Sequence, residues 1–276
     1  MDWIYALQVV FLGVVEGLTE FLPVSSTGPL IIAGDLIGFH ETAAADTFYV
    51  AIQAGAIVAV CWHYKERILS ILMNLFKPGK EQRLAVNTVV AFIPAAVLGV
   101  LLASYVKHYL FNPAAVATAL VVGGILILWL ESWQQKTGRI PRVATMDDMT
   151  WKDALGVGFM QCLALIPGTS RSGATIIGGM ALGLSRTAAT EFSFFLAIPT
   201  IFGAMVYDLW KSREMLSADG LPGIAVGFAV SFVSAIVVVR WLLRYVAHND
   251  FKAFGWYRIV FGIMVLVLCS MGLADF

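Results

Sequence analysis

Residues 16–30 read EGLTEFLPVSSTGPL, from Glu16 to Leu30, and they interrupt an otherwise apolar region of the chain. The stretch combines two carboxylates with hydroxyls, glycines and prolines, while no Lys or Arg occurs between Met1 and Trp62. Carboxylates and breaks in regular structure are costly in an apolar surrounding. The stretch therefore indicates a functional loop rather than a packing element.

A second stretch echoes the first 145 residues later, where residues 161–175 read QCLALIPGTSRSGAT. This shift aligns small and apolar residues without a gap: Gly13 with Gly158, Ser25 with Ser170, Gly28 with Gly173, Ile31 with Ile176, Ile32 with Ile177, Gly34 with Gly179 and Gly38 with Gly183. Glu16 then falls on Gln161 and Ser26 on Arg171, so the first copy carries acids and the second a base. The alternative explanation is ordinary small-residue packing between membrane helices.

The composition predicts an all-α polytopic membrane protein. Of the 276 residues, 59% are hydrophobic and only 13% are charged, whereas soluble domains contain about 25% charged residues. The three cysteines are scattered through apolar segments, without the spacing of a metal site or a disulfide framework. We therefore expect a single integral membrane domain over residues 1–276.

The apolar segments predict six transmembrane helices and two re-entrant helix pairs. Crossing a bilayer takes about 20 apolar residues, and six segments approach that length: 47–62, 84–105, 113–130, 190–209, 223–241 and 255–271. Four segments are only half as long and flank the two polar stretches: 3–15, 30–39, 153–165 and 176–184. We expect them to form re-entrant pairs over residues 3–40 and 153–184.

The distribution of basic residues predicts the topology. The loops 63–83, 131–152 and 240–258 hold 13 of the 18 Lys and Arg residues, and the loops between them hold 3. The positive-inside rule places the first group in the cytoplasm, which puts both termini outside and gives the two re-entrant pairs opposite orientations. The chain is thus predicted to be an inverted-topology repeat, with repeat 1 at about 1–105, repeat 2 at about 150–245, and a site between them near the midplane.

The first stretch offers a cation site or a base. Glu16 and Glu20 are four residues apart, so they share one face of a helix. Carboxylate oxygens suit Mg²⁺ or Ca²⁺, with substrate phosphate and water completing the coordination. The alternative is a structural pair satisfied by the backbone or by one arginine.

The second stretch offers an anion site. Successive backbone N–H groups at the start of a helix near Gly173 can cradle a phosphate, and Arg171 adds a bidentate donor. Hydroxyls surround it at Ser170, Ser172 and Thr175. The alternatives are helix capping for the hydroxyls and an ion pair with Glu20 for the arginine. Together the two stretches indicate phosphoryl chemistry or phosphate binding, and the membrane setting indicates a lipid-linked phosphate.

At this point the chain resembles a known family. The sequences EGLTEFLPVSSTG at 16–28 and PGTSRSGAT at 167–175 resemble the two signature motifs of undecaprenyl-diphosphate phosphatases, the bacitracin-resistance proteins. The resemblance implies hydrolysis of undecaprenyl diphosphate at the outer face of the bacterial inner membrane, with a divalent cation. That activity recycles the carrier lipid for cell-wall synthesis and confers bacitracin resistance. We expect a membrane-lipid substrate and no nucleic acid, and we allow for a homodimer.

The resemblance also implies roles for individual residues. Glu16 and Glu20 match the acidic motif and its cation site, with Glu20 the more critical of the two. Ser26, flanked by Ser25 and Thr27, matches a candidate nucleophile that competes with water. Arg171 matches the diphosphate-binding arginine, surrounded by Ser170, Ser172, Gly173 and Thr175. Asp147 or Asp148 is a weaker match to a loop acid.

One position departs from the family pattern. The family usually has His after Ser-Ser-Thr-Gly, whereas this chain has Pro29. Of the histidines, only His40 is expected to approach the motifs. Either the chemistry does not need that His, or the chain is catalytically impaired, or it is a divergent member that acts as a polyprenyl-phosphate flippase or transporter.

Overall fold

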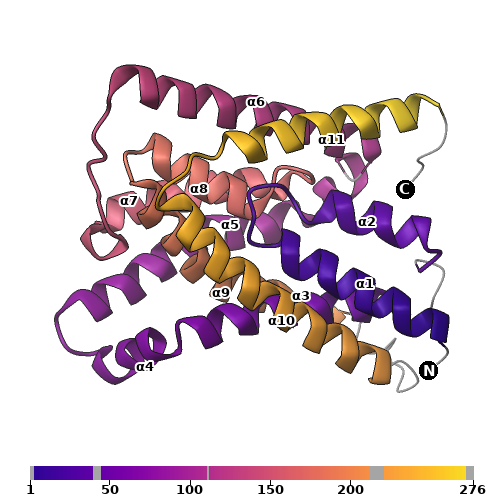
Figure 1. Ribbon diagram of the computed structural model, residues 1–276. Helices are drawn as coiled ribbons and strands as arrows, with labels where there is room; N and C mark the ends of the chain where they lie inside the picture. The colour runs from indigo at the N-terminus through magenta and orange to yellow at the C-terminus, as the bar shows by residue number, and fades with distance from the viewer. Residues whose placement is uncertain (1–2, 40–44, 111, 212–220, 272–276) are drawn as a thin grey trace.

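The computed structural model describes residues 3–39, 45–110, 112–211 and 221–271, and helices make up most of this part of the chain (Figure 1). The elements are α1 (Trp3–Thr19), α2 (Thr27–Leu36), α3 (Ala45–His63), α4 (Lys65–Asn74), α5 (Lys80–Tyr109), α6 (Pro113–Thr137), η1 (Met146–Asp148), α7 (Trp151–Cys162), η2 (Leu163–Leu165), α8 (Arg171–Ala181), α9 (Arg186–Lys211), α10 (Leu221–Val246) and α11 (Lys252–Ser270). The predicted all-α class is confirmed.

Long apolar helices dominate the fold, as the apolar runs predict. Within the described residues, five helices are long and apolar enough to cross a membrane, namely α5, α6, α9, α10 and α11. The remaining predicted span, 47–62, corresponds to α3. It makes a sixth crossing only if α3 and α4 count as one span bent by 73°.

Helix α4 corrects one prediction, because residues 63–83 are not simply a polar loop. Its apolar residues Leu69, Leu72, Met73 and, just beyond it, Phe76 follow helical spacing and are more than half exposed. The charged residues Lys65, Glu66 and Arg67 made the segment read as a loop. An amphipathic helix of this kind suits a membrane–water interface.

The other predicted loops are also shorter than expected, because the helices continue through polar residues at their ends. Helix α5 reaches Tyr109 and α6 reaches Thr137. In the predicted loop 240–258, only residues 247–251 lie between α10 and α11. Arg240 and Arg258 therefore belong to helices, although both were assigned to a cytoplasmic loop.

The three basic segments nevertheless meet at one end of the molecule, on the left of Figure 1. Arg67 of α4 pairs with Asp147 of η1, and Gln135 of α6 donates to Asp250, just before α11, at 2.9 Å. The start of α1 and the end of α11 lie at the opposite end. The clustering agrees with the charge asymmetry that predicted the topology.

The helices α1–α2 and α7–α8 form two helix pairs that repeat the same backbone at a spacing of 145 residues. Positive φ angles occur at Ser25 (73°) and Ser170 (72°), and again at Gly38 (66°) and Gly183 (102°). The hydrogen bond from Phe39 N–H to the Gly34 carbonyl (2.9 Å) has its counterpart from Leu184 N–H to the Gly179 carbonyl (3.0 Å). The sequence echo therefore corresponds to the same local structure.

The first helix of each pair packs on a long helix from the other half of the chain: α1 packs on α10, and α7 packs on α5. A Cβ at Gly13 of α1 would lie 2.8 Å from the Gly227 carbonyl of α10. A Cβ at Gly158 of α7 would lie 2.5 Å from the Ala91 carbonyl of α5. These two glycines occupy equivalent positions in the echo, and both permit a close approach of helix backbones. The two halves of the chain thus exchange partners.

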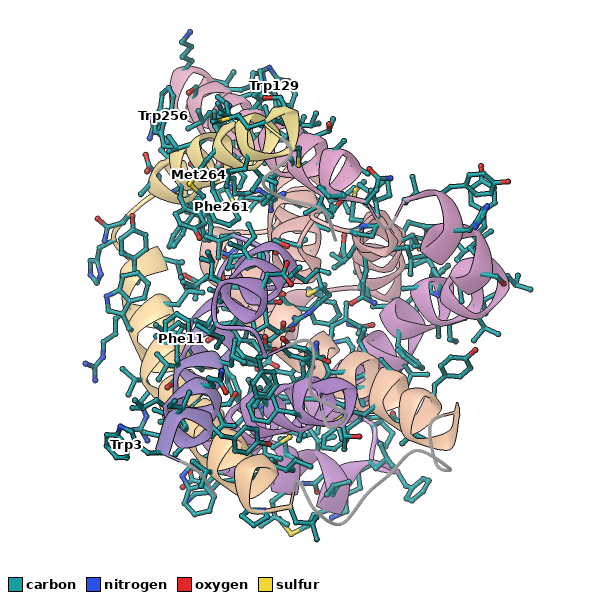
Figure 2. The ribbon with its side chains drawn as sticks, turned by 90° about the vertical axis from the view of Figure 1, so that its right-hand side faces the viewer. Trp3, Phe11, Trp129, Trp256, Phe261 and Met264 are labelled. Carbon is teal, nitrogen blue, oxygen red and sulfur yellow. The ribbon has the colours of Figure 1, made fainter. Side chains whose placement is uncertain are left out.

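Large apolar side chains cover the outside of the molecule. Trp3, Trp129 and Trp256 lie at the periphery in Figure 2 and are 74%, 61% and 60% exposed. Exposed aromatic and aliphatic side chains on this scale mark a surface that contacts lipid rather than water. The composition's prediction of a multi-pass membrane protein is consistent with this surface.

Candidate active site

The two polar loops meet, as the sequence analysis predicted. Nη2 of Arg171 donates to Oε1 of Glu20 at 3.0 Å, across 151 positions of sequence. Oγ of Ser26 donates to the other oxygen of that carboxylate, Oε2, at 2.8 Å. Glu20 therefore accepts hydrogen bonds from two side chains that occupy equivalent positions in the two loops.

The helix ends place these three side chains. Glu20 follows the last residue of α1, and its N–H still bonds to the Glu16 carbonyl at 3.0 Å. Ser26 immediately precedes α2, where its hydroxyl does not cap the helix. Arg171 is the first residue of α8. Ser26 and Arg171 thus lie at helix N-termini, where backbone N–H groups lack helix partners and can bind an anion, whereas Glu20 lies just beyond a helix C-terminus.

Arg171 is held on several sides. Nη1 donates to the Ser193 carbonyl of α9 at 3.1 Å, and the guanidinium lies 5.7 Å from the centre of the Phe21 ring. Its Nε is buried without a partner. The Arg171 and Glu20 side chains are 12% and 11% exposed. The guanidinium is therefore oriented but retains N–H groups that no protein atom uses.

The hydroxyls of the second loop bond within the protein. Ser172 Oγ donates to the Leu22 carbonyl of the first loop at 2.7 Å. Ser170 Oγ accepts from the Gly173 N–H at 3.1 Å, and Thr175 Oγ1 lies 2.7 Å from Ser193 Oγ. These contacts join the loops and cap α8. Phosphate binding by Ser170, Ser172, Gly173 and Thr175 stays a prediction.

Glu16 differs from Glu20. It is fully buried in α1, and neither of its carboxylate oxygens has a hydrogen-bond partner among the described residues. A buried carboxylate without a partner is costly unless it holds a proton or a cation. The described residues contain no group of three or more His, Cys, Asp or Glu side chains that could hold a metal alone.

For the other predicted site residues, the structure shows no hydrogen bond to Glu20 or Arg171 among the described side chains. Ser25 is buried and carries one of the positive φ angles, and Thr27 begins α2, although its side chain is not described. His40 lies outside the described residues. Asp147 pairs with Arg67 and Asp148 accepts from Thr145, so both acids bond away from the two loops.

Pro29 has a structural consequence. In α8 the Ala174 N–H bonds to the Ser170 carbonyl at 2.9 Å. Pro29 occupies the equivalent position in the first loop and has no N–H, so that hydrogen bond has no counterpart. Helix α2 accordingly begins at Thr27, one residue later in the repeat than α8 at Arg171. Ser26 stays outside the helix.

Two contributors to the site were missed from sequence. Ser193 supplies a carbonyl to Arg171 and a hydroxyl to Thr175, but a serine within an apolar helix is a weak signal. Arg258 of α11 is fully buried and donates to carbonyls in both loops. Its signal was available, because a charged residue fell inside the predicted span 255–271.

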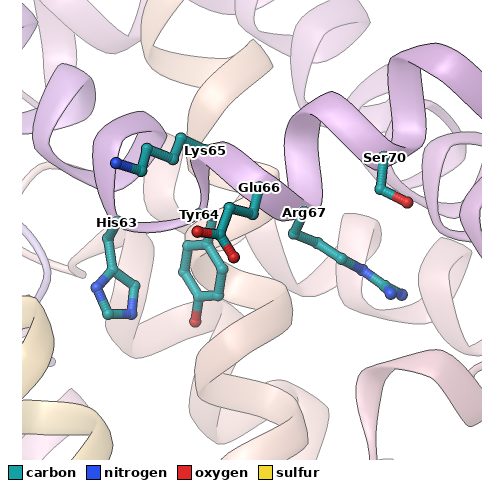
Figure 3. A pocket seen from close by; sticks show the side chains of 6 residues that line it. All are labelled: His63, Tyr64, Lys65, Glu66, Arg67 and Ser70. Atoms are coloured by element: carbon teal, nitrogen blue, oxygen red, sulfur yellow. The ribbon is translucent and has the colours of Figure 1, made fainter.

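Two hollows in the described part of the chain are not lined by Glu20, Ser26 or Arg171. A hollow of about 490 Å³ lies at the junction of α3 and α4 (Figure 3), lined by His63, Tyr64, Lys65, Glu66, Arg67 and Ser70. A smaller apolar cavity of about 180 Å³ lies between α6 and α8 and reaches Thr169 and Gly173 of the second loop.

Comparisons with known proteins identify the family of the chain. The family model described as bacitracin resistance protein BacA matches residues 9–264. An undecaprenyl-diphosphatase of Nitrosomonas europaea is 55% identical over all of this chain and 98% of its own length. Undecaprenyl-diphosphatase 1 of Paraburkholderia xenovorans is 56% identical over 99% of this chain and 98% of its own length. The chain belongs to the bacitracin resistance protein family.

Proposed function

We propose that the protein hydrolyses undecaprenyl diphosphate to undecaprenyl phosphate and inorganic phosphate. The observation that carries the proposal is the Glu20 carboxylate, which accepts from Ser26 on one oxygen and from Arg171 on the other. A carboxylate bonded to a hydroxyl nucleophile and to a phosphate-binding cation is suited to phosphoryl transfer. The names of the relatives supply the lipid.

The chemistry follows from the two hydrogen bonds. Either Ser26 Oγ or a water in its place attacks the terminal phosphorus, and the proton passes to Glu20 Oε2, which already accepts from Ser26 at 2.8 Å. The bond between the terminal phosphorus and the bridging oxygen breaks, and undecaprenyl phosphate leaves with that oxygen. If Ser26 is the nucleophile, water then hydrolyses the phosphoserine.

Arg171 binds the diphosphate in this proposal. Its unused N–H groups donate to phosphate oxygens without displacing Glu20 or the Ser193 carbonyl. The same guanidinium bonds one oxygen of Glu20 while the other accepts from Ser26. No histidine is required at position 29, because Glu20 already provides the proton acceptor.

A divalent cation fits the first helix pair. Glu16 has two buried oxygens without partners, and Glu20 follows one turn later. Oxygen donors of this kind suit Mg²⁺ or Ca²⁺. Since two carboxylates cannot complete a coordination sphere, substrate phosphate and water would supply the rest. A bound cation would neutralise charge on the diphosphate.

The proposal includes the membrane orientation. The basic segments gather at one end of the molecule, and by the positive-inside rule we propose that this end lies in the cytoplasm, with both termini external and the site open to the external side. The repeated backbone and the exchanged helix partners support an inverted-topology repeat with a site between its halves. Hydrolysis there would recycle the carrier lipid for cell-wall synthesis and confer bacitracin resistance by removing the lipid diphosphate.

Lipid translocation is the second candidate function. It is favoured by the same repeat, since many transporters share this architecture. The two functions differ in whether the protein releases phosphate from the lipid. A transporter would bind a polyprenyl phosphate and move it across liposomes without releasing phosphate.

The test is phosphate release from undecaprenyl diphosphate by purified protein in detergent, with and without a chelator. We expect turnover that requires Mg²⁺ or Ca²⁺. It should fall by at least about 10²-fold in Glu20→Ala and in Arg171→Ala. Wild-type rates in both variants would overturn the assignment, and lipid translocation without turnover would establish the second function.

A further inference from the structure

Arg258 is an unusual residue for its place in the fold. It lies on α11, whose neighbouring side chains Trp256 and Val260 are 60% and 65% exposed on the surface that faces lipid. Arg258 itself is fully buried. Among the described residues it forms no ion pair with any carboxylate. A buried, unpaired guanidinium is costly, so its retention calls for a reason.

The guanidinium uses its entire donor capacity on backbone carbonyls. Arginine has five N–H donors, and five hydrogen bonds of 2.9 to 3.3 Å leave Arg258. The acceptors are the carbonyls of Pro23, Gly168, Thr169, Ala119 and Leu120. With no donor left, Arg258 cannot bind phosphate itself.

These acceptors belong to three separate elements. Pro23 lies in the first loop, midway between Glu20 and Ser26, and its carbonyl receives Nη1 at 3.3 Å. Thr169 lies two residues before Arg171 in the second loop, and its carbonyl receives Nη1 at 2.9 Å. The Gly168 carbonyl also lies in the second loop, and the remaining two, of Ala119 and Leu120, belong to α6. One nitrogen atom therefore joins the loop that carries the acid to the loop that carries the base.

The surroundings are built to admit this side chain. A Cβ added at Gly123 of α6 would lie 2.3 Å from Nη2 of Arg258. A Cβ at Gly173 would lie 3.0 Å from Nη1. No methyl group fits at 2.3 Å, so Gly123 is required for the guanidinium to reach its acceptors. Buried loop carbonyls without a helix partner need donors in any case, and here one side chain supplies them for both loops.

We propose that Arg258 is a positioning residue: by bonding the carbonyls of both loops it fixes the spacing of Glu20 and Ser26 relative to Arg171. The inference rests on the proposed function for its kinetic consequence only. Misplacing catalytic groups by about 1 Å costs on the order of 10²-fold in rate. The loss should appear in kcat, because Arg171 and the first turn of α8 still bind the diphosphate.

Two substitutions test the positioning role. Arg258→Gln removes the charge and most of the donors, whereas Arg258→Lys keeps the charge but not the planar fork. We expect kcat for phosphate release to fall by about 10²-fold in Arg258→Gln with KM within about threefold. Arg258→Lys should remain well below wild type, since a point charge cannot bond both loops at once.

Gly123→Ala is a third variant that leaves Arg258 in place. Alanine normally stabilises a helix relative to glycine, so Gly123→Ala should do no harm unless its methyl group displaces the Arg258 guanidinium. Because we infer that it does, we expect the same loss of kcat as in Arg258→Gln. Arg186→Gln is the matched control, because Arg186 is a half-buried arginine that pairs with Glu131 outside both loops. It should keep the wild-type kcat.

Hydrogen exchange gives a readout that does not depend on hydrolysis. In Arg258→Gln and Gly123→Ala, amides of residues 21–26 and 168–172 should exchange at least about tenfold faster than in wild type, while those of α9 and α10 stay unchanged. Unchanged loop exchange and kcat in folded Arg258→Gln would overturn the proposal, as would uniformly faster exchange over all helices. If wild type released no phosphate, the exchange result would still decide the role of Arg258.

Discussion

The helix pairs α1–α2 and α7–α8 share a backbone but differ in chemistry. Both break at a serine with φ near 70°, and both end their second helix with the same hydrogen bonds around a glycine of positive φ. Yet the first pair buries Glu16 where the second buries Gln161, and it presents Ser26 where the second presents Arg171. The first pair has become the acidic half of the site and the second the basic half.

This difference shows how one local structure can serve two roles. The repeated backbone supplies the same turn twice, each with a serine of positive φ before the second helix. In the proposed function, the side chains at a few equivalent positions decide whether that turn provides a proton acceptor or an anion binder. The Glu20 carboxylate joins the two halves by accepting from both.

The largest expected effect comes from removing the acid of the first pair. Glu20→Gln keeps the shape and an oxygen for the hydrogen bond from Arg171 but cannot accept a proton. We expect kcat to fall by about 10³-fold, within the range of a general base. Glu81→Gln is a matched control, because Glu81 is also a glutamate paired with an arginine, but away from the two loops. Its Oε1 lies 3.6 Å from Nη1 of Arg67. A comparable loss in Glu81→Gln would contradict the role assigned to Glu20.

The corresponding change in the second pair is Arg171→Lys. Lysine keeps the charge but loses the fork that bonds Glu20 and the Ser193 carbonyl together. We expect kcat/KM for undecaprenyl diphosphate to fall by about 10²-fold, partly through a higher KM. Steady-state kinetics at several lipid concentrations would measure it. An unchanged KM together with an unchanged kcat would remove Arg171 from the site.

Glu16→Gln makes the first pair resemble the second, which has Gln161 at that position. The change removes a buried carboxylate without partners, so thermal stability should be equal or higher. The Mg²⁺ concentration for half-maximal phosphate release should rise at least about tenfold if Glu16 is a cation ligand. Gln161→Ala should leave that concentration unchanged. An unaltered cation requirement in Glu16→Gln would exclude the ligand role.

The smallest effect is expected at Pro29, where the two pairs differ by one N–H. Pro29→His restores the residue usual in the family and the N–H that Ala174 has in α8. Because Glu20 already accepts from Ser26, we expect less than about threefold change in kcat, far below the about 10²-fold that a new general base supplies. A gain of that size would show that the natural chain lacks a catalytic group.

Much of this arrangement could be predicted from sequence, because its signals are local. The apolar runs predict the long helices, and the ungapped echo of glycines and serines predicts the two helix pairs. The meeting of Glu20 with Arg171 followed from the opposite charges of the two loops and the expected inversion. The helix ends and α4 were wrong, since Arg240 was taken to end a helix that runs on to Val246, and Lys65 was taken to lie in a loop where it begins α4.

The rest depends on contacts that the sequence does not encode locally. Arg258 stands near the edge of an apolar run, and nothing in the run shows that its side chain turns inward to the two loops. The Ser193 carbonyl binds Arg171 only because α9 packs against α8. Backbone acceptors of this kind carry no residue signature, so only the assembled fold reveals them.

The central claim, that the two loops form one catalytic site, is tested most directly by a double-mutant cycle. Phosphate release from undecaprenyl diphosphate would be measured for wild type, Glu20→Gln, Arg171→Gln and the double variant. Residues that act as one unit give strongly non-additive losses. We predict that the double variant lies within about threefold of the slower single variant. Losses in kcat/KM that multiply would contradict the account, because they would mean that the two loops act independently.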